Sequence, residues 1–494
     1  MTDTLRPDAA PDSPADLDAF DALIRDALAQ LRAHVETASR GEGPGTGYAP
    51  LRDVYQQLEV ARWLPAGGMD RDSFNRFLAH YLEHSVKLHH PAYIAHQVGI
   101  PDYPGVIAAT INGVLNNPMA IYEMGPSAAT LEFAVINWML EKVGWAAQPF
   151  PDEASGVEGS AGVLTHGGSL ANLTGLLAAR ARVAPEAWER GTPHDLAVLA
   201  PANCHYSVAR AVSILGLGAD AVIPMDVTEH GVIRPERLPD ALRRVRDAGR
   251  RPMALVANAC STATGLHDPL RVIGEFCRDE NIWYHVDACH GATALLAKDA
   301  RRYLDGIELA DAVVWDAHKM MQVPVLCAAL LLRDGRDFDR AFHQEASYLA
   351  YGHDRDGYDS LPRAVECTKA SLGLKIFLGL AFRGERALGA YVDDRYAMAR
   401  RAYDIIDAHP DFSCPYVPES NILCFRYGDD DALQKPIRDA LVRERSFHLT
   451  SATVDGRAYL RMTVMNKHTD ETTIARLLTQ IQATAATLRA AAGE

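Results

Sequence analysis

The stretch Ala312-Val313-Val314-Trp315-Asp316-Ala317-His318-Lys319-Met320-Met321 places an apolar run directly before three ionisable side chains. The apolar run is typical of the end of a buried strand. A lysine beside such a strand is costly to bury unless its charge is removed or paired. One way to remove the charge is to convert the amine into an imine. Lys319 is therefore a candidate Schiff-base lysine.

Apolar strands alternate with helical segments on both sides of this stretch. The expected strands lie at 163–165, 197–199, 221–224, 254–257, 283–287, 312–315 and 327–332, and expected helices between them include 206–215, 239–248 and 269–280. Such strand–helix repeats predict an α/β fold with a mainly parallel sheet covered on both faces. In these sheets ligands bind beyond the carboxyl ends of the strands, where Lys319 lies.

Composition narrows the class of protein. The chain has 494 residues, enough for two or three packed lobes, and a formal net charge of −15. That acidity argues against a nucleic-acid or anionic-membrane partner, and the apolar runs are far shorter than a membrane span. The eight cysteines are scattered without a CxxC pair, which argues against a structural metal or a disulfide framework and fits a reducing cytoplasm.

Four segments are expected along the chain. Residues 1–16, rich in Asp, Pro and Ala, are predicted to be disordered. Residues 17–125 form separate helices of the kind that packs on a second subunit. Residues 126–375 form the large α/β domain, and 376–494 a small C-terminal α/β domain. A continuous helical run is expected at about 367–403.

Two further groups complete a set that one cofactor needs. Gly167-Gly168-Ser169 at a helix N-terminus can cradle a phosphate, although the same triplet also occurs as a plain turn. Asp287 ends a strand one strand–helix–strand unit before Lys319 and could pair with a ring nitrogen or serve as an ordinary strand-end acid. Pyridoxal phosphate requires an amine for its aldehyde, an acid for its pyridine nitrogen and an anion nest.

Two side chains in neighbouring loops are candidates for contact with that cofactor. His205 begins a helix and could stack on the ring, although a lone histidine is more often structural. Thr262, in a loop after a strand, could contact the cofactor or Asp287.

Seven motifs carry a family resemblance: THGGSLANL (165–173), the CH of NCHYSV (203–208), ACSTATGLHDP (259–269), HVDACHG (285–291), WDAHKMMQVP (315–324), YL with ECTK (348–349, 366–369) and LRMTVMN (460–466). Together they resemble the group II pyridoxal-phosphate-dependent amino-acid decarboxylases over about residues 85–490. The resemblance implies the type I, aspartate-aminotransferase-like fold, and a homodimer with its active sites at the subunit interface.

The resemblance also assigns roles to matched positions. It makes Lys319 the Schiff-base lysine and gives cofactor contacts to Gly168, Ser169, His205, Thr262, Asp287 and the preceding His318. His205 is also expected to take part in delivering the proton to the substrate. Arg461 matches an arginine that meets a substrate carboxylate, and Gln97 a pocket glutamine. The stretch 348–359 corresponds to a mobile catalytic loop whose tyrosine protonates the substrate carbanion. Tyr358 is the candidate, with Tyr351 as the alternative.

The chain also departs from the family pattern. Asp316-Ala317 stands where most relatives have Asn-Pro or Asp-Pro, and Cys289-His290 where a small residue and then Tyr or Trp are usual. His290 could therefore form a different pocket wall.

The expected reaction is decarboxylation of an L-amino acid to its amine and CO2. Because WDAHKMMQVP and YEMGP (122–126) resemble the glutamate and cysteine sulfinate branch, an acidic substrate such as glutamate, aspartate or cysteine sulfinate is expected. Aromatic, aliphatic and diamino-acid substrates stay open. So do a decarboxylation-dependent oxidative deaminase, a cysteine desulfurase using Cys414 or Cys424, and a non-enzymatic cofactor-binding scaffold.

Overall fold

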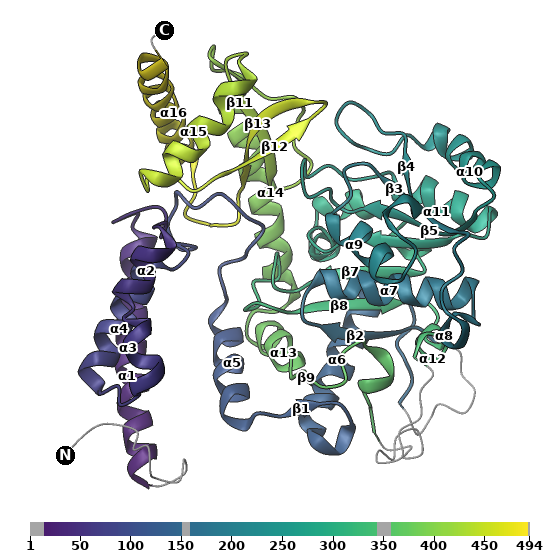
Figure 1. Ribbon diagram of the computed structural model, residues 1–494, viewed down its shortest axis with the longest axis horizontal. Coiled ribbons are helices and arrows are strands. Elements are labelled where there is room, and N and C mark those ends of the chain that lie inside the picture. The colour runs from purple at the N-terminus through teal and green to yellow at the C-terminus, as the bar shows by residue number, and fades with distance from the viewer. Residues whose placement is uncertain (1–13, 151–158, 343–356, 493–494) are drawn as a thin grey trace.

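The computed structural model describes residues 14–150, 159–342 and 357–492 (Figure 1). Its centre is a seven-stranded sheet with the order β2-β8-β7-β6-β5-β3-β4. Among these seven strands β8 runs in one direction and the other six run in the opposite one, so the sheet is mainly parallel, and the predicted α/β class is confirmed. The strands are β2 (Ala161–Thr165), β3 (Leu196–Pro201), β4 (Val222–Met225), β5 (Arg251–Asn258), β6 (Trp283–Asp287), β7 (Ala312–Asp316) and β8 (Ala328–Leu332).

Helices cover both faces of the sheet, and alternating strand residues divide between two apolar clusters. Val313 and Leu331 belong to one cluster, whereas Val314 and Leu330 belong to the other. The first face carries α6 (Pro126–Val143), α10 (Leu238–Asp247) and α11 (Leu270–Asp279). The second carries α7 (Gly168–Val183), α8 (Ala187–Arg190), α9 (Tyr206–Ile214) and α12 (Arg336–Ala341). Burial on both faces explains why these strands are nearly continuous apolar runs.

The C-terminal part forms a smaller layer of sheet and helix. Its antiparallel sheet has the order β10-β11-β13-β12, made of β10 (Phe412–Ser413), β11 (Ile422–Tyr427), β12 (Thr450–Val454) and β13 (Arg457–Thr463). The helices α15 (Asp431–Arg443) and α16 (Glu471–Ala492) share one apolar cluster with this sheet. The expected division at residues 126 and 376 stays a prediction.

The helical run expected at 367–403 is interrupted. The structure has β9 (Lys369–Ala370), α13 (Gly373–Arg383) and α14 (Glu385–Asp407) instead. The strand β9 pairs with β1 (Pro118–Met119), and Gly384 adopts φ +75° between the two helices. Because a left-handed backbone favours glycine and ends a helix, Gly384 is the local cause of the second break.

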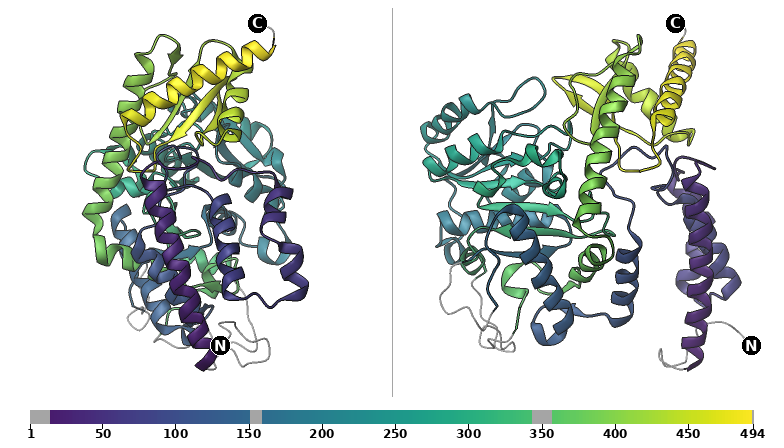
Figure 2. Two further views of the ribbon diagram at one scale, coloured as in Figure 1. Left: turned by 90° about the vertical axis from the view of Figure 1, so that its left-hand side faces the viewer. Right: turned by 180° about the vertical axis from the view of Figure 1, so that it is seen from behind.

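The N-terminal helices form a separate bundle beside the body of the molecule (Figure 2). They are α1 (Pro14–Ser39), α2 (Leu51–Gln57), α3 (Val60–Ala66) and α4 (Arg71–His84). Asp26 of α1 accepts hydrogen bonds from Arg71 and Asn75 of α4. The next helix, α5 (Tyr103–Leu115), packs on α13. Most of the stretch 1–16, expected to be disordered, lies outside the described residues, but Pro14–Asp16 begin α1.

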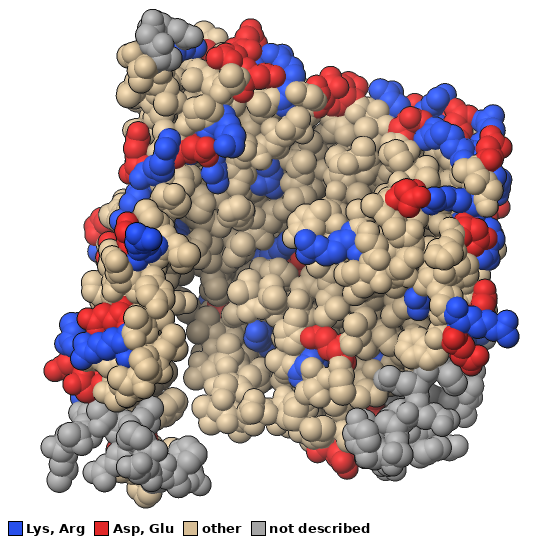
Figure 3. All heavy atoms as spheres, in the orientation of Figure 1, with Lys and Arg blue, Asp and Glu red and all other residues tan. Residues whose placement is uncertain are grey.

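No helix within the described residues is both long and apolar enough to cross a bilayer. On the face shown in Figure 3, basic side chains are interspersed with acidic ones.

Candidate active site

A cavity of about 270 Å³ lies beyond the carboxyl ends of the central strands. It brings together seven of the ten residues singled out from the sequence: Gly168, Ser169, His205, Thr262, Asp287, His318 and Lys319. The other lining residues are His166, Gly167, Asn172, Cys289, Asp316 and Leu326. The cavity therefore collects an amine, two carboxylates and a helix N-terminus in one place.

Lys319 lies in the turn that follows β7, and its ammonium faces a carboxylate. Its Nζ is 3.1 Å from Oδ2 of Asp316, which ends β7. Burial lowers the pKa of Lys319, but the charge and hydrogen bond of Asp316, together with Cys289 and the charge of Asp287, outweigh burial and leave that pKa above its ordinary value. The lysine is thus held as an ammonium until a reaction removes its proton.

Asp287 ends β6, which is the strand next to β7. Its Oδ1 accepts a hydrogen bond from the backbone N–H of Cys289, and its Oδ2 accepts one from the side-chain amide of Asn172 at 3.0 Å. Burial would raise the pKa of Asp287, but these donors and the charge of Lys319 lower it below the ordinary value. The side chain therefore stays a carboxylate, which suits a protonated ring nitrogen.

The N-terminus of α7 forms the anion cradle. Gly167 adopts φ +103° immediately before the helix, a conformation that favours glycine. A methyl group added at Gly168 would stand 2.4 Å from Sγ of Cys289, so only glycine fits there. Ser169 follows on the same turn and lines the cavity. Free backbone N–H groups at this helix end are suited to a phosphate.

His205 caps α9 and presents a neutral imidazole. Its Nδ1 accepts hydrogen bonds from the hydroxyl and the backbone N–H of Ser207, which leaves the ring proton on Nε2. Burial lowers the pKa of His205 below its ordinary value. A neutral ring of this kind can stack on a flat ligand.

Two further predicted residues complete the wall of the cavity. Nδ1 of His318 donates to the carbonyl of Cys327 at 2.8 Å and so fixes the turn that carries Lys319. The backbone carbonyl of Thr262 accepts a 2.8 Å hydrogen bond from Arg461, which anchors this part of the wall.

Three predicted residues lie outside the cavity lining. Tyr358 is buried, its hydroxyl donates to the carbonyl of Gly162, and its ring contacts Phe133. The alternative, Tyr351, lies outside the described residues. The amide nitrogen of Gln97 is buried with no hydrogen-bond partner among the described residues.

Arg461 is the third predicted residue outside the cavity lining, and its side chain is almost completely buried. It donates to the carbonyls of Thr262, Ala263 and Ala95 and to the hydroxyl of Thr450. No carboxylate within the described residues forms an ion pair with it, and burial lowers the pKa of Arg461. It is thus a buried cation supported only by neutral dipoles.

Asn172 has a central position in the site that the sequence did not suggest. Its amide joins Asp287 and His285 of β6 to Ser207 of α9. The available signal is a lone amide side chain, one turn after the cradle, in the mainly apolar run LANLTGLLAA. His166 at the cavity edge was also missed, and its Nδ1 lies 2.5 Å from a carboxylate oxygen of Glu366.

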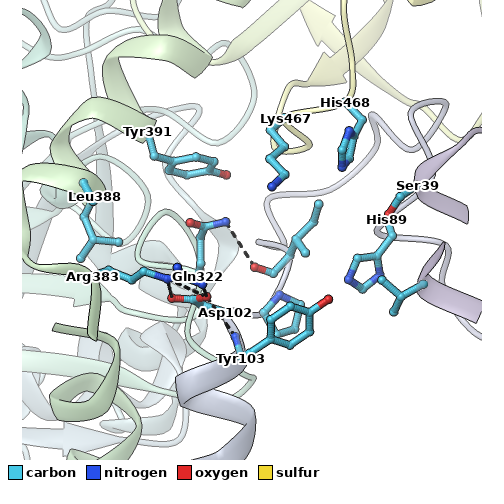
Figure 4. Close-up of a pocket in the computed structure, with 14 residues that line it drawn as sticks. Ser39, His89, Asp102, Tyr103, Gln322, Arg383, Leu388, Tyr391, Lys467 and His468 are labelled. Atoms are coloured by element: carbon cyan, nitrogen blue, oxygen red, sulfur yellow. Dashed lines mark hydrogen bonds and ion pairs between the residues drawn. The ribbon is translucent and has the colours of Figure 1, made fainter. Parts of the chain in front are cut away.

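A second cavity of about 300 Å³ is lined by residues of α1, of the start of α5, of α14, of the turn after Lys319 and of the segment before α16 (Figure 4). Within it, Arg383 and Asp102 pair with each other, and Gln322 donates to the carbonyl of Ile100. It contains none of the ten residues singled out from the sequence.

Comparisons with known proteins identify the family of the chain. The acidic amino acid decarboxylase GADL1 of Mus musculus is 31% identical over 366 residues, which are 73% of this chain and 64% of that protein, so the match spans less than two thirds of the relative. The L-2,4-diaminobutyrate decarboxylase of Acinetobacter baumannii is 26% identical over 439 residues, 84% of each chain.

A solved structure shares the fold over nearly the whole chain. The crystal structure of mouse CSAD superposes with a TM-score of 0.87 at 24% identity and covers 95% of this chain and 99% of that one. The pyridoxal-dependent decarboxylase conserved domain matches residues 72–428, well over half of the sequence. The chain therefore belongs to the pyridoxal-dependent decarboxylase family.

Proposed function

We propose that this protein decarboxylates an L-amino acid, with an acidic amino acid as its substrate and pyridoxal 5′-phosphate as its cofactor. The observation that carries the proposal is the convergence of Lys319, Asp287 and the N-terminus of α7 in one cavity. The three groups match the aldehyde, the ring nitrogen and the phosphate of that cofactor.

The residues present fit the cofactor. The cradle at Gly168 leaves no room for a side chain, as close approach to a phosphate requires. Lys319 would hold the cofactor covalently, Asp287 would pair with its ring nitrogen, and His205 would stack on its ring. When bound, pyridoxal phosphate offers a carbonyl carbon to the substrate amine and a ring that withdraws the electrons left by departing CO2.

The protein side chains maintain the charges that this chemistry needs. Asn172 and the backbone N–H of Cys289 keep Asp287 ionised, so that it can hold a proton on the ring nitrogen. Ser207 holds the ring of His205 by its Nδ1 and leaves the Nε2–H free. His318 fixes the turn of Lys319 through the Cys327 carbonyl.

The proposal of an acidic substrate is supported by the positive charge of Arg461, which has no carboxylate partner among the described residues. Its guanidinium is buried, and a substrate carboxylate would neutralise it. The relative named acidic amino acid decarboxylase supports the same class.

A diamino acid is the second candidate substrate. The relative named L-2,4-diaminobutyrate decarboxylase matches 84% of this chain and 84% of its own length, a fuller overlap than that of the acidic relative.

The site itself disfavours a desulfurase. Cys424 is fully buried in β11, where its thiol lies 3.5 Å from the carbonyl of Ala263, and burial raises the pKa of both Cys424 and Cys414. Neither thiol lines the cavity, so neither is placed to attack a bound substrate.

We also propose a homodimer. The helix α5 exposes a row of apolar side chains, Val106, Ile107, Ile111, Val114 and Leu115, and the arm α1–α4 extends beside the body (Figure 2). An apolar row of this kind is typical of a surface that a partner covers. Light scattering should give twice the chain mass, and Ile107→Glu with Val114→Glu should give the monomer.

All eight cysteines are free thiols, which supports a reducing compartment, and we propose the cytoplasm.

The function is tested with purified protein, added pyridoxal phosphate and a panel of L-amino acids that includes aspartate, glutamate, cysteine sulfinate and 2,4-diaminobutyrate. Released CO2, amine, aldehyde and peroxide are measured, with Lys319→Ala as the control. Amine and CO2 in equal amounts from an acidic amino acid support the proposal. Aldehyde with peroxide would indicate an oxidative deaminase, and no product from any amino acid would overturn the enzyme assignment.

A further inference from the structure

A second carboxylate, Asp316, lies directly against the phosphate cradle. A methyl group placed at Gly168 would stand 2.8 Å from its Oδ1 and 3.0 Å from its Oδ2. The side chain is buried, and Oδ1 has no hydrogen-bond partner among the described residues. The cradle thus has an unsatisfied carboxylate oxygen beside the helix end that would receive a phosphate.

The negative charge of Asp316 is balanced by Lys319, which must lose its own positive charge when it reacts. Lys319 is its nearest cation, with Nζ 3.1 Å from Oδ2, whereas Nε2 of His318 is 3.7 Å away. An ammonium has no lone pair, so Lys319 must lose a proton before it can attack an aldehyde. After that loss Asp316 would be an unpaired carboxylate beside a phosphate, and like charges in a buried site are strongly unfavourable.

The groups around Asp316 provide little positive charge to balance its carboxylate once Lys319 is neutral. Asp287, the other carboxylate of the cavity, keeps its own donors, Asn172 and the backbone N–H of Cys289. The titratable or charged groups that interact with Asp316 are Lys319 and His318 from its own turn, Cys289 after β6, His205 at α9 and Cys327 before β8. Burial lowers the pKa of His205 and so keeps its ring neutral at neutral pH, and a cysteine side chain carries no positive charge in either of its forms.

We propose that Asp316 accepts the proton that Lys319 loses during cofactor attachment and retains it as a neutral carboxyl. One N–H bond of Lys319 would break with its electron pair left on nitrogen, and an O–H bond would form on Asp316. The two remaining amine hydrogens would leave with the aldehyde oxygen as water when Lys319 holds the cofactor through a carbon–nitrogen double bond. The neutral carboxyl then donates a hydrogen bond to the phosphate at Gly168 in place of repelling it. This inference rests on the proposed cofactor.

The test measures protons as well as binding. Apo protein is titrated with pyridoxal phosphate at pH 7 by calorimetry in buffers of different ionisation enthalpy, and attachment is followed by the visible absorbance that Lys319→Ala abolishes. Asp316→Asn keeps the shape and a hydrogen-bond donor but cannot accept a proton. Because loss of the Asp316 charge also lowers the pKa of Lys319, the apo variant is first titrated to find that pKa. Below it, the variant should release about one additional proton per site on binding relative to wild type. Its affinity should strengthen with pH relative to wild type, by up to about tenfold per pH unit.

Two other variants distinguish proton uptake by Asp316 from hydrogen bonding to the phosphate and from the loss of any nearby carboxylate. Asp316→Ala should release the same additional proton as Asp316→Asn. It should bind pyridoxal phosphate more weakly than Asp316→Asn, because alanine has no hydrogen-bond donor for the phosphate. Glu366→Gln removes the carboxylate that contacts His166, a residue of the cavity lining, and should keep the wild-type proton count.

Equal proton release by wild type and Asp316→Asn would overturn the inference and leave the proposed function intact. Weaker binding by Asp316→Asn than by wild type at every pH would also overturn it, since the charged carboxylate would then be needed. Absence of Lys319-dependent binding in wild type would overturn both.

Discussion

The side-chain amide of Asn172 donates a 3.0 Å hydrogen bond to Oδ2 of Asp287 across the cavity floor. The same amide nitrogen contacts the hydroxyl of Ser207, and its oxygen accepts from Nε2 of His285 at 2.8 Å. One helix residue thereby connects Asp287 with the serine that orients His205.

Replacing Asn172 should weaken both the fold and cofactor binding. In Asn172→Leu, Asp287 and His285 each lose a buried partner, at a cost of about 1–3 kcal/mol for each unsatisfied group. Urea unfolding should show lower stability, and the apparent Kd for pyridoxal phosphate should rise. The matched control is Thr174→Val on the same helix, whose hydroxyl bonds only to the Leu170 carbonyl. Cofactor affinity equal to wild type in Asn172→Leu would remove its role at Asp287.

Arg461 should determine how tightly an acidic substrate binds. Loss of a charge-assisted pair of hydrogen bonds costs about 1.5–3 kcal/mol, so Arg461→Ala should lower kcat/KM about 10- to 100-fold. Cofactor content, measured by absorbance, should be retained. Arg461→Lys keeps the charge and should recover part of the loss. Arg438→Ala, a half-buried arginine of the same lobe, is the matched control. Unchanged kcat/KM in Arg461→Ala would show that the guanidinium only ties Thr262 and Ala95 together.

A site residue can be predicted from the sequence when its position in a strand or helix already indicates where it lies. Lys319 and Asp287 end apolar strands, and parallel strands gather their carboxyl ends at one edge, so the cavity that holds both residues was predictable. Asn172 carries no such signal, because its partners come from β6 and α9, far along the chain.

Local geometry explains the other differences. Spacing alone does not say which tyrosine of the 348–359 stretch faces a site, and the structure ties the hydroxyl of Tyr358 to Gly162. Likewise, apolar periodicity continues across Gly384, and only its backbone angle reveals the break between α13 and α14.

A buried ion pair supports the strand that leads into the cradle. Lys369 pairs with Glu132, whose Oε1 also accepts from the backbone N–H of Leu164 in β2. Lys369→Met leaves the carboxylate without its cation and should destabilise the protein by about 3–5 kcal/mol. The double variant Glu132→Leu/Lys369→Met removes both charges and should regain much of that loss. Urea unfolding of the three proteins checks this, and equal stability of the two variants would exclude a coupled pair.

His290 should make the protein sensitive to acid. It is buried, its Nε2 lies 2.7 Å from Oδ1 of Asn421, and burial lowers the pKa of His290 to about 3. Between pH 6.5 and about 3, the unfolded chain binds a proton at this histidine and the folded chain does not. Stability therefore falls with falling pH, by about 1.4 kcal/mol per pH unit from this residue. His290→Gln has no such proton, so its unfolding free energy between pH 6 and pH 5 should fall less than that of wild type by about that amount. The two proteins are also compared at pH 7.5, where His290 is neutral in both states, to separate the packing effect of the substitution. Parallel curves for the two proteins below pH 6.5 would mean that folded His290 takes up its proton as readily as the unfolded chain.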